Sequence, residues 1–463
     1  MSVGSQPVSP PPIVRAPAVD QAPSPVQRRA LGRTGVRVTI RGRSLKLRGL
    51  HRPPSGLLGV LTILGPGLIA ATAGDDAGGV ATYSQVGARF GYALLWVLLV
   101  ITVSLAVVQE MCARLGAATG RGLLDLIRER FGIGWALLAV GVILIANGGV
   151  TVTEFVGIGA ALELFGVSKY VAVPVSAVAL WYIVIAGSYG RVEKLLLLLT
   201  LVFFAYPAAA VLAHPDWTAL ARGAFVPSLR TDPDYLMLLV GLIGTTITPY
   251  MQLFQQSAVV EKAVGRDDYG PERADAYAGA VFGNMIAAFI IIATGATLHV
   301  AGATDIQTAR DAAQALQPVA GAAAVSLFGV GLLGASLVAG GVLPLATAYS
   351  VSEAFGFRKG VNLDFRRAPI FLGLFSALVA VGALVALIPN VPIIQLLVGI
   401  QVLNGALLPV VLLFILLLAT DRRLMGGLRN GPLNTVLGWT TLVLVTSAVL
   451  ILLGSQVFSF MSG

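Results

Sequence analysis

The stretch that decides the fold is Ala73-Gly74-Asp75-Asp76-Ala77-Gly78-Gly79, which lies inside an apolar segment over residues 58–83. A second polar stretch, Gly244-Thr245-Thr246-Ile247-Thr248-Pro249-Tyr250, interrupts another apolar segment over residues 235–262. Glycine and proline disfavour continuous helix, and an unwound backbone exposes carbonyl oxygens that can face a bound ion. The two stretches therefore predict two long apolar helices that are each broken near the middle.

The rest of the chain is as apolar as these two segments. Of its 463 residues, 56% are hydrophobic and only 11% are charged, where a soluble domain carries roughly 25% charged residues. A helix needs about 20 apolar residues to cross the hydrocarbon core of a bilayer. Eleven segments meet this length and predict an all-helical integral membrane protein: 58–83, 91–116, 132–164, 170–188, 193–213, 235–262, 275–300, 322–355, 368–388, 392–420 and 433–457.

The eleven segments divide into two halves of five, each opened by a broken segment. Because five is an odd number, the second half must run inverted relative to the first. The third segment of each half is also unusually long. The sequence thus predicts a transmembrane domain over 56–460, made of inverted repeats over 58–213 and 235–420 and an extra helix over 433–457. Broken helices at matching positions of inverted repeats indicate a transporter with its binding site near the membrane midplane.

The positive charges set the expected orientation. With the N-terminus in the cytoplasm, only five of the 31 Lys and Arg residues fall outside, which agrees with the positive-inside rule. We therefore expect a multi-pass protein of the cell (inner) membrane, with a cytoplasmic N-terminus and an external C-terminus. The five external residues are Arg89, Lys169, Arg222, Arg230 and Arg310.

Residues 1–52 form a separate region that holds ten basic residues and one acidic residue, Asp20, among many Pro, Ser and Gly residues. No sustained apolar period is present, so this region is expected to be a disordered basic tail. Its basic residues suit contact with anionic lipid of the bilayer, and we expect no nucleic-acid partner. The sequence leaves the oligomeric state open and is compatible with a monomer.

The residue types present exclude several kinds of chemistry. A single cysteine, Cys112, and three histidines argue against disulfides and against a zinc site built from Cys and His. No phosphate loop, nucleotide fingerprint or nucleophile elbow occurs in a suitable context. We therefore expect neither an enzyme nor a bound cofactor, and any ion must be held by oxygen ligands.

Asp75 and Asp76 are the first candidates for such a site, because an acidic residue in the middle of a membrane helix costs at least about 2.5–3.5 kcal/mol. Carboxylates together with exposed carbonyl oxygens make a site for a hard cation. The alternative is that one Asp only caps the broken helix. The segment over 235–262 adds a group of neutral oxygen donors that suits a wet cavity, or alternatively hydrogen bonding between helices: Thr245, Thr246, Thr248, Tyr250, Gln252, Gln255 and Gln256.

Other polar residues lie on the second, third and tenth segments. Glu154 is either a proton relay or a partner of another polar group, whereas Glu110, with Arg114 four residues later, is expected to form an ion pair. Three polar residues of the tenth segment share one helical face: Gln395, Gln401 and Asn404. One of them could close the site from the opposite side, or all three could serve ordinary polar packing.

Several short motifs resemble the NRAMP family of divalent-metal transporters, and in particular its magnesium-transporting NRAMP-related branch, over residues 56–425. They are Gly65-Pro66-Gly67 followed nine residues later by Asp76, the run Cys112–Gly120, Glu154-Phe-Val-Gly157, and Thr248-Pro249-Tyr250. Each is weak alone, but together they occur in order and on the right segments. The resemblance implies a leucine-transporter-like fold and transport by alternating access.

The resemblance also implies a ligand set. The family's Asp-Pro-Gly-Asn motif falls on 76–79, so that Asp76 is the ligand carboxylate and Gly79 replaces the Asn. The family's Met-Pro-His falls on 248–250, so that Thr248 replaces the methionine and Tyr250 the histidine. Backbone carbonyl ligands correspond to Ala73 and Thr245, and a glutamine ligand corresponds to Gln401.

These departures lead to an expectation about the ion. A thioether favours softer transition metals, whereas a site built only from oxygen admits Mg²⁺, and Gly79 leaves room for a partly hydrated ion. A further family histidine falls on Gln255 or Gln256 and a third-helix aspartate on Thr151, so that only Glu154 remains of the family's proton pathway. We therefore expect voltage-driven import of Mg²⁺, and also of Mn²⁺, without proton coupling.

Three alternatives stay open at this point. The nearest is a proton-coupled manganese or iron transporter, which would discriminate against Mg²⁺. Another is a carrier of amino acids or other organic solutes with the same fold, in which an acidic pair would be unfavourable. The third is a membrane protein that does not transport, such as a metal sensor, whose working part is the basic tail.

Overall fold

The computed structural model describes residues 37–40, 43–46, 76–186, 205–266, 269–314, 321, 323–361 and 363–462. Contacts separate residues 1–62 from residues 63–463, and the two units are treated individually. The predictions for Ala73, for Asp75 and for the helix before Asp76 lie outside the described residues. Most of the predicted segment over 193–213 does so as well.

The first unit contributes a short hairpin. Strand β1 (Arg37–Ile40) pairs antiparallel with β2 (Arg43–Lys46), with Arg37 opposite Lys46 and Ile40 opposite Arg43. These eight residues differ from the disorder expected over 1–52. Val38, Thr39 and Ile40 favour extended backbone because of their β-branched side chains, and this signal is too short to predict a strand among so many basic residues.

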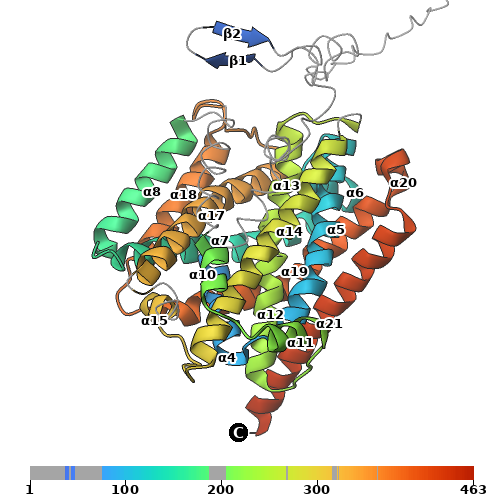
Figure 1. Ribbon diagram of the computed structural model, residues 1–463. Helices are drawn as coiled ribbons and strands as arrows, with labels where there is room; N and C mark the ends of the chain where they lie inside the picture. Colours follow the sequence, from blue (N-terminus) through green and yellow to red (C-terminus); the bar gives the residue numbers. More distant parts are fainter. Residues whose placement is uncertain are drawn as a thin grey trace, which may run out of the picture. The chain divides into compact units, whose positions relative to one another are not determined.

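The second unit is a bundle of helices (Figure 1). In its described part, eight helices are long and apolar enough to span a membrane. Apart from α4 and α10, the main helices agree with the predicted segments to within several residues: α4 (Ala77–Phe90), α5 (Leu95–Thr119), α7 (Ile133–Glu163), α8 (Lys169–Ala186), α10 (Ala205–Leu212), α12 (Pro233–Thr246), α13 (Pro249–Glu261), α14 (Tyr269–Thr294) continued by the π-helix η3 (Gly295–His299), α17 (Ala323–Phe355), α18 (Pro369–Ala386), α19 (Ile393–Thr420) and α21 (Pro432–Ser462). Helix α4 covers only the second part of the segment predicted over 58–83 and continues beyond its end to Phe90.

Short helices occur between the long ones and were not predicted. Helix α6 is amphipathic and follows α5 directly, whereas α11 begins at an Asp216 side chain that accepts hydrogen bonds from two backbone N–H groups. Such elements carry no membrane-length apolar run, so hydropathy alone does not reveal them. They are α6 (Leu123–Phe131), α11 (Trp217–Phe225), α15 (Ala309–Gln314), α20 (Arg422–Met425) and η4 (Gly426–Leu428).

The segment over 235–262 is divided into two helices. Helix α12 ends at Thr246 and α13 begins at Pro249, and between them Thr248 has an extended backbone (φ −74°, ψ 145°). Proline suits the first position of a helix because its missing N–H would have no partner there. The backbone thus leaves helical geometry at Ile247 and Thr248, directly before Pro249.

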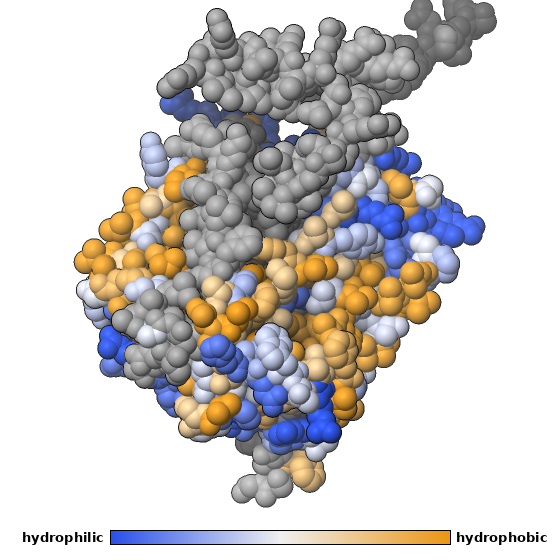
Figure 2. All heavy atoms as spheres, viewed as in Figure 1, coloured by the Kyte–Doolittle hydropathy of each residue, from blue (hydrophilic) through white to orange (hydrophobic). Residues whose placement is uncertain are grey.

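The helices pack in pairs around a buried interior. Helix α7 lies along α17, α12 lies along α19, and α5 lies along α14. Helices α8 and α21 lie toward the edges of the bundle (Figure 1), and their exposed side chains include Val178 and Leu450, which are 65% and 63% exposed. Figure 2 shows hydrophobic side chains over much of the visible surface, as a protein in contact with lipid requires.

The expected ion pair of Glu110 is confirmed. Arg114 Nη2 lies 3.1 Å from Glu110 Oε2, and both side chains are buried. Tyr269 of α14 donates a hydrogen bond to Glu110 Oε1, and Asn434 of α21 donates one to Oε2 at 3.3 Å. The pair therefore connects three helices, and its role is to hold α14 and α21 against α5.

Candidate metal site

Asp76 forms the N-cap of α4 and is fully buried. Its backbone is extended (φ −68°, ψ 178°), and its Oδ1 atom accepts a hydrogen bond from the Gly79 backbone N–H at 2.5 Å. The first N–H groups of a helix have no partner within the helix and favour a negative charge. The cap that we considered as an alternative role for Asp76 is thus present, and the second carboxylate oxygen is not used by it.

Gln401 of α19 lies directly against Asp76. Its Nε2 atom donates to both carboxylate oxygens, at 3.0 and 3.1 Å, while its Oε1 atom accepts a hydrogen bond from Asn404 at 2.9 Å. The amide nitrogen of Gln401 therefore faces the carboxylate, and the amide would have to turn before its oxygen could face a cation. Gly78 leaves room for this contact, because a Cβ atom there would overlap Gln401 Nε2.

Glu154 of α7 is the second carboxylate at the same helix end. It is fully buried, its Oε2 atom accepts a hydrogen bond from the Ala77 N–H at 3.2 Å, and its Oε1 atom accepts one from Thr153 at 3.2 Å. Gly157 permits this approach, because a Cβ atom at that position would overlap the side chain of Ala77. Asp76 and Glu154 thus share the N-terminus of α4.

Within the described residues, neither Asp76 nor Glu154 forms an ion pair with Lys or Arg. A buried carboxylate without a cationic partner is costly, and a helix N-terminus offsets only part of that cost. Two such groups next to each other cannot both stay charged without compensation. Protons or a divalent cation would neutralise them.

The end of α12 and the start of α13 supply the neutral groups. Thr245, Thr248 and Tyr250 are all buried, and Tyr250 lies within electrostatic range of Asp76 and Glu154. Further along α13, the amide groups of Gln252 and Gln255 are buried and have no hydrogen-bond partner within the described part of the chain. These residues suit the wet cavity that was predicted for this helix.

The three remaining candidate residues, Gln256, Gln395 and Gly79, have different surroundings. Gln256 donates from Nε2 to the backbone carbonyl of Arg121 at 2.9 Å, so this amide connects α13 to the start of α6. Gln395 is exposed on α19 and does not reach the site. Gly79 contributes its N–H to Asp76 and has no side chain to narrow the space beside it.

Asn404, which the sequence offered either to close the site or for ordinary polar packing, donates to Gln401 and orients it. Two other contributors were missed in the sequence analysis. Gly78 and Gly157 were not assigned a role, although each makes space for a neighbouring helix. Their positions beside Asp76 and Glu154 were the available signal, because glycine next to a buried acid often permits close approach of another chain segment.

The fold of this chain is similar to that of solved structures. The chain superposes on the crystal structure of the Eremococcus coleocola manganese transporter with an aromatic bis-isothiourea substituted compound (TM-score 0.71, 20% identity, 88% of this chain and 90% of that chain). It also superposes on MhsT in complex with L-phenylalanine (TM-score 0.54, 16% identity, 84% of this chain and 98% of that chain). These likenesses show an all-helical fold of the expected leucine-transporter-like type, which is confirmed.

Sequence comparison gives the family. The model of the natural resistance-associated macrophage protein-like (Nramp) family matches residues 67–455. The divalent metal cation transporter MntH of Deinococcus radiodurans is 30% identical over 449 residues, covering 93% of this chain and 96% of that protein. MntH of Yersinia pestis is 31% identical over 399 residues, covering 83% and 93%.

This chain belongs to the Nramp family of divalent metal transporters, and the resemblance carried by its motifs is confirmed. It is a multi-pass membrane transporter and not an enzyme. The metal ion is its substrate, and transport requires no cofactor.

Proposed function

We propose that this protein imports Mg²⁺, and also Mn²⁺, across the cell membrane through a site centred on Asp76. The observation that carries the proposal is the fully buried carboxylate of Asp76, which contacts Gln401 and has no basic partner in the described part of the chain. Thr248, at the N-cap of α13, is also buried. Thr248 stands where the family has a methionine. Oxygen ligands without a thioether do not favour transition metals over Mg²⁺.

The proposed site extends to groups beyond these contacts. Asp76 would bind the ion as the principal ligand, and Asp75 would bind through water. Backbone carbonyls of Ala73 and Thr245 and the side chains of Thr248 and Gln401 would complete the ligand set. Since Mg²⁺ releases its waters reluctantly, the space beside Gly79 would admit a partly hydrated ion.

The proposal includes a membrane arrangement. We infer eleven transmembrane helices in two inverted repeats, with the first and sixth helices broken, a cytoplasmic N-terminus and an external C-terminus. Support comes from the division between α12 and α13 and from the position of Asp76 at the beginning of α4. Alternating access would expose the site first to the outside and then to the cytoplasm.

We further propose that the membrane potential drives uptake without proton coupling. Two charges that cross a 100 mV potential release about 4.6 kcal/mol, enough for roughly a thousandfold accumulation. Glu154 accepts hydrogen bonds from Ala77 and Thr153, and Thr151 donates one to the Asn147 carbonyl at 2.7 Å. Helix α18 carries no basic residue that could receive a proton from Glu154 or Thr151. The second candidate is a proton-coupled manganese or iron transporter; the solved Eremococcus coleocola manganese transporter, which has the same fold, supports manganese as an ion but not the coupling.

Transport by purified protein in proteoliposomes tests this proposal. We expect Mg²⁺ uptake to rise with an imposed inside-negative potential, to be inhibited by Mn²⁺ and to leave the internal pH unchanged, because no proton accompanies the ion. A fluorescent pH indicator inside the vesicles provides the second measurement. Internal acidification that depends on metal and disappears in Glu154→Gln would instead establish the proton-coupled transporter.

Thr248→Met tests the basis of selectivity. A thioether near Asp76 should raise the preference for Mn²⁺ over Mg²⁺ by about tenfold, because sulfur binds the softer ion better. The ratio of uptake rates of the two ions measures the change. Thr248→Leu is the matched control, since it adds similar bulk without sulfur and should lower both rates without changing their ratio. An equal change of ratio in both variants would contradict the ligand argument.

A further inference from the structure

Helix α13 carries a series of buried polar side chains that leads away from the proposed site. It begins near Thr248 and continues through Gln252 and Gln255, whose amides have no hydrogen-bond partner among the described residues. Such amides suit contact with water or a hydrated ion. Ser257 is also buried, but it lies on another face of α13, because the two residues from Gln255 to Ser257 turn the helix by about 200°.

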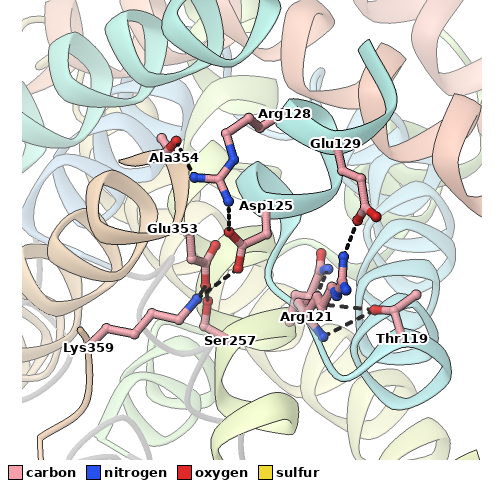
Figure 3. A network of polar contacts seen from close by, with 10 residues as sticks. Thr119, Arg121, Asp125, Arg128, Glu129, Ser257, Glu353, Ala354 and Lys359 are labelled. Carbon is pink, nitrogen blue, oxygen red and sulfur yellow. Dashed lines mark hydrogen bonds and ion pairs between the residues drawn. The ribbon is translucent and has the colours of Figure 1, made fainter. Parts of the chain in front are cut away.

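A cluster of charged groups lies against Ser257 (Figure 3). Glu353, near the end of α17, is only 2% exposed, and its Oε1 atom accepts a hydrogen bond from Ser257 at 3.0 Å. Lys359 Nζ lies 3.0 Å from the same oxygen and 3.3 Å from Asp125 Oδ2 of α6. The ammonium group of Lys359 therefore lies between two carboxylates.

Two features of the surroundings of the Glu353 carboxylate suit the binding of a ligand. Its Oε2 atom is buried and has no hydrogen-bond partner among the residues that the structure describes. A Cβ atom at Gly122 would overlap the Glu353 carboxylate, so glycine at the start of α6 leaves space for it. An open oxygen on a buried carboxylate is available to a further ligand.

The second carboxylate is also fixed and can be reached from the surface. Arg128 lies 3.3 Å from Asp125 Oδ1 and donates to the Ala354 carbonyl at 2.9 Å, which holds α6 against the end of α17. Asp125 lines a surface cavity of 430 Å³ together with Arg121, Arg128 and Glu129. The cluster thus lies between Ser257 of α13 and a surface cavity.

We propose that Asp125, Glu353 and Ser257 form a second divalent-cation site on the way from the Asp76 site to the cytoplasm, occupied at rest by the ammonium group of Lys359. The proposal rests on the proposed function, which makes this face cytoplasmic. Two carboxylates and a hydroxyl are ligands for a hard divalent cation. Lys359 is a compact charge on a flexible stem and belongs to a loop without regular structure, so it can leave when the ion arrives.

Binding of Mn²⁺ to purified full-length protein, followed by the loss of the free-ion signal in electron paramagnetic resonance, tests this site. Asp76→Asn serves as the background because it removes the proposed midplane site. Adding Lys359→Met should produce one bound Mn²⁺ with an affinity at least tenfold above the background. Adding Glu353→Gln as well should remove that ion, because one of the two carboxylates is lost.

Arg358→Met in the same background is the matched control, since it removes one positive charge from the adjacent, exposed residue and should leave Mn²⁺ binding unchanged. Thermal unfolding of each variant verifies that it is folded. The second site would be wrong if Lys359→Met bound no additional Mn²⁺, or if the additional Mn²⁺ remained bound after Glu353→Gln. The cluster would then be an ion pair that only holds the helices together. Failure of the proposed function would appear separately, as uptake unchanged by Asp76→Asn.

Discussion

Asp76→Asn is expected to lower Mg²⁺ and Mn²⁺ uptake at least about 100-fold, which corresponds to about 2.8 kcal/mol of lost stabilisation of the bound ion. Asn has nearly the shape of Asp and is an equally good N-cap, so the hydrogen bond from the Gly79 N–H can remain. The change therefore removes the charge and keeps the start of α4. Initial uptake rates in proteoliposomes measure the effect.

Asp232→Asn is the matched control for this experiment. Asp232 caps α12 as Asp76 caps α4, since it accepts a hydrogen bond from the Tyr235 N–H at 2.9 Å, but it is exposed. Uptake by this variant should equal that of the wild type. If Asp76→Asn transported normally, Asp76 would be only a helix cap and the proposed site would be wrong.

Gly244→Ala should have the second large effect, on both stability and transport. Helices α12 and α19 approach so closely that a Cβ atom at Gly244 would overlap the Gln401 carbonyl oxygen and the backbone nitrogen of Gly405. Backbone atoms cannot rotate away as a side chain can, so the helices must separate. Overpacking of this kind costs about 1–3 kcal/mol or more, and Gln401 would be displaced from Asp76.

We expect the apparent melting temperature of Gly244→Ala to fall by about 5 °C or more, together with most of the uptake activity. Gly241→Ala is the control on the same helix, because a Cβ atom there makes only ordinary contacts, at 3.4 Å with Val402 and 3.5 Å with Thr82. It should melt and transport like the wild type. Similar behaviour of the two variants would show that the close contact at Gly244 is not required.

The long helices could be predicted from the sequence because the bilayer imposes a simple rule on apolar length. The segment predicted over 132–164 is α7 (Ile133–Glu163), and the one predicted over 392–420 is α19 (Ile393–Thr420). Hydropathy does not reveal α6 or the β1–β2 hairpin, because neither contains an apolar run of membrane length. Their residues are mixed and their segments are short.

The candidate site was predictable in its charges and less so in its contacts. The energetic cost of Asp76 in an apolar segment marked it as functional, and the shared face of Gln401 and Asn404 suggested an approach from α19. The orientation of the Gln401 amide depends on Asn404 and Gly78, which is a matter of tertiary packing. The approach of Glu154 to the start of α4 likewise depends on how α7 packs.

The contacts within the charged cluster of Figure 3 also could not be predicted from the sequence. The charge pattern placed Lys359 on the cytoplasmic side but could not indicate its partners. Asp125 and Glu353 are 228 residues apart in the chain, and only the packing of α6 on α17 brings them to one ammonium group. Contacts between such distant segments leave no periodic signal in a single sequence.

The break between α12 and α13 has a mechanical consequence. Helix α12 is fixed to α19 where Gly244 faces Gly405, whereas α13 is connected to α6 and α17 through Gln256 and Ser257. The two parts of this segment thus pack against different helices, and the non-helical residues Ile247 and Thr248 join them. Rotation at these two residues would move α13 together with the charged cluster around Lys359, while α12 and α19 keep Gln401 in place beside Asp76.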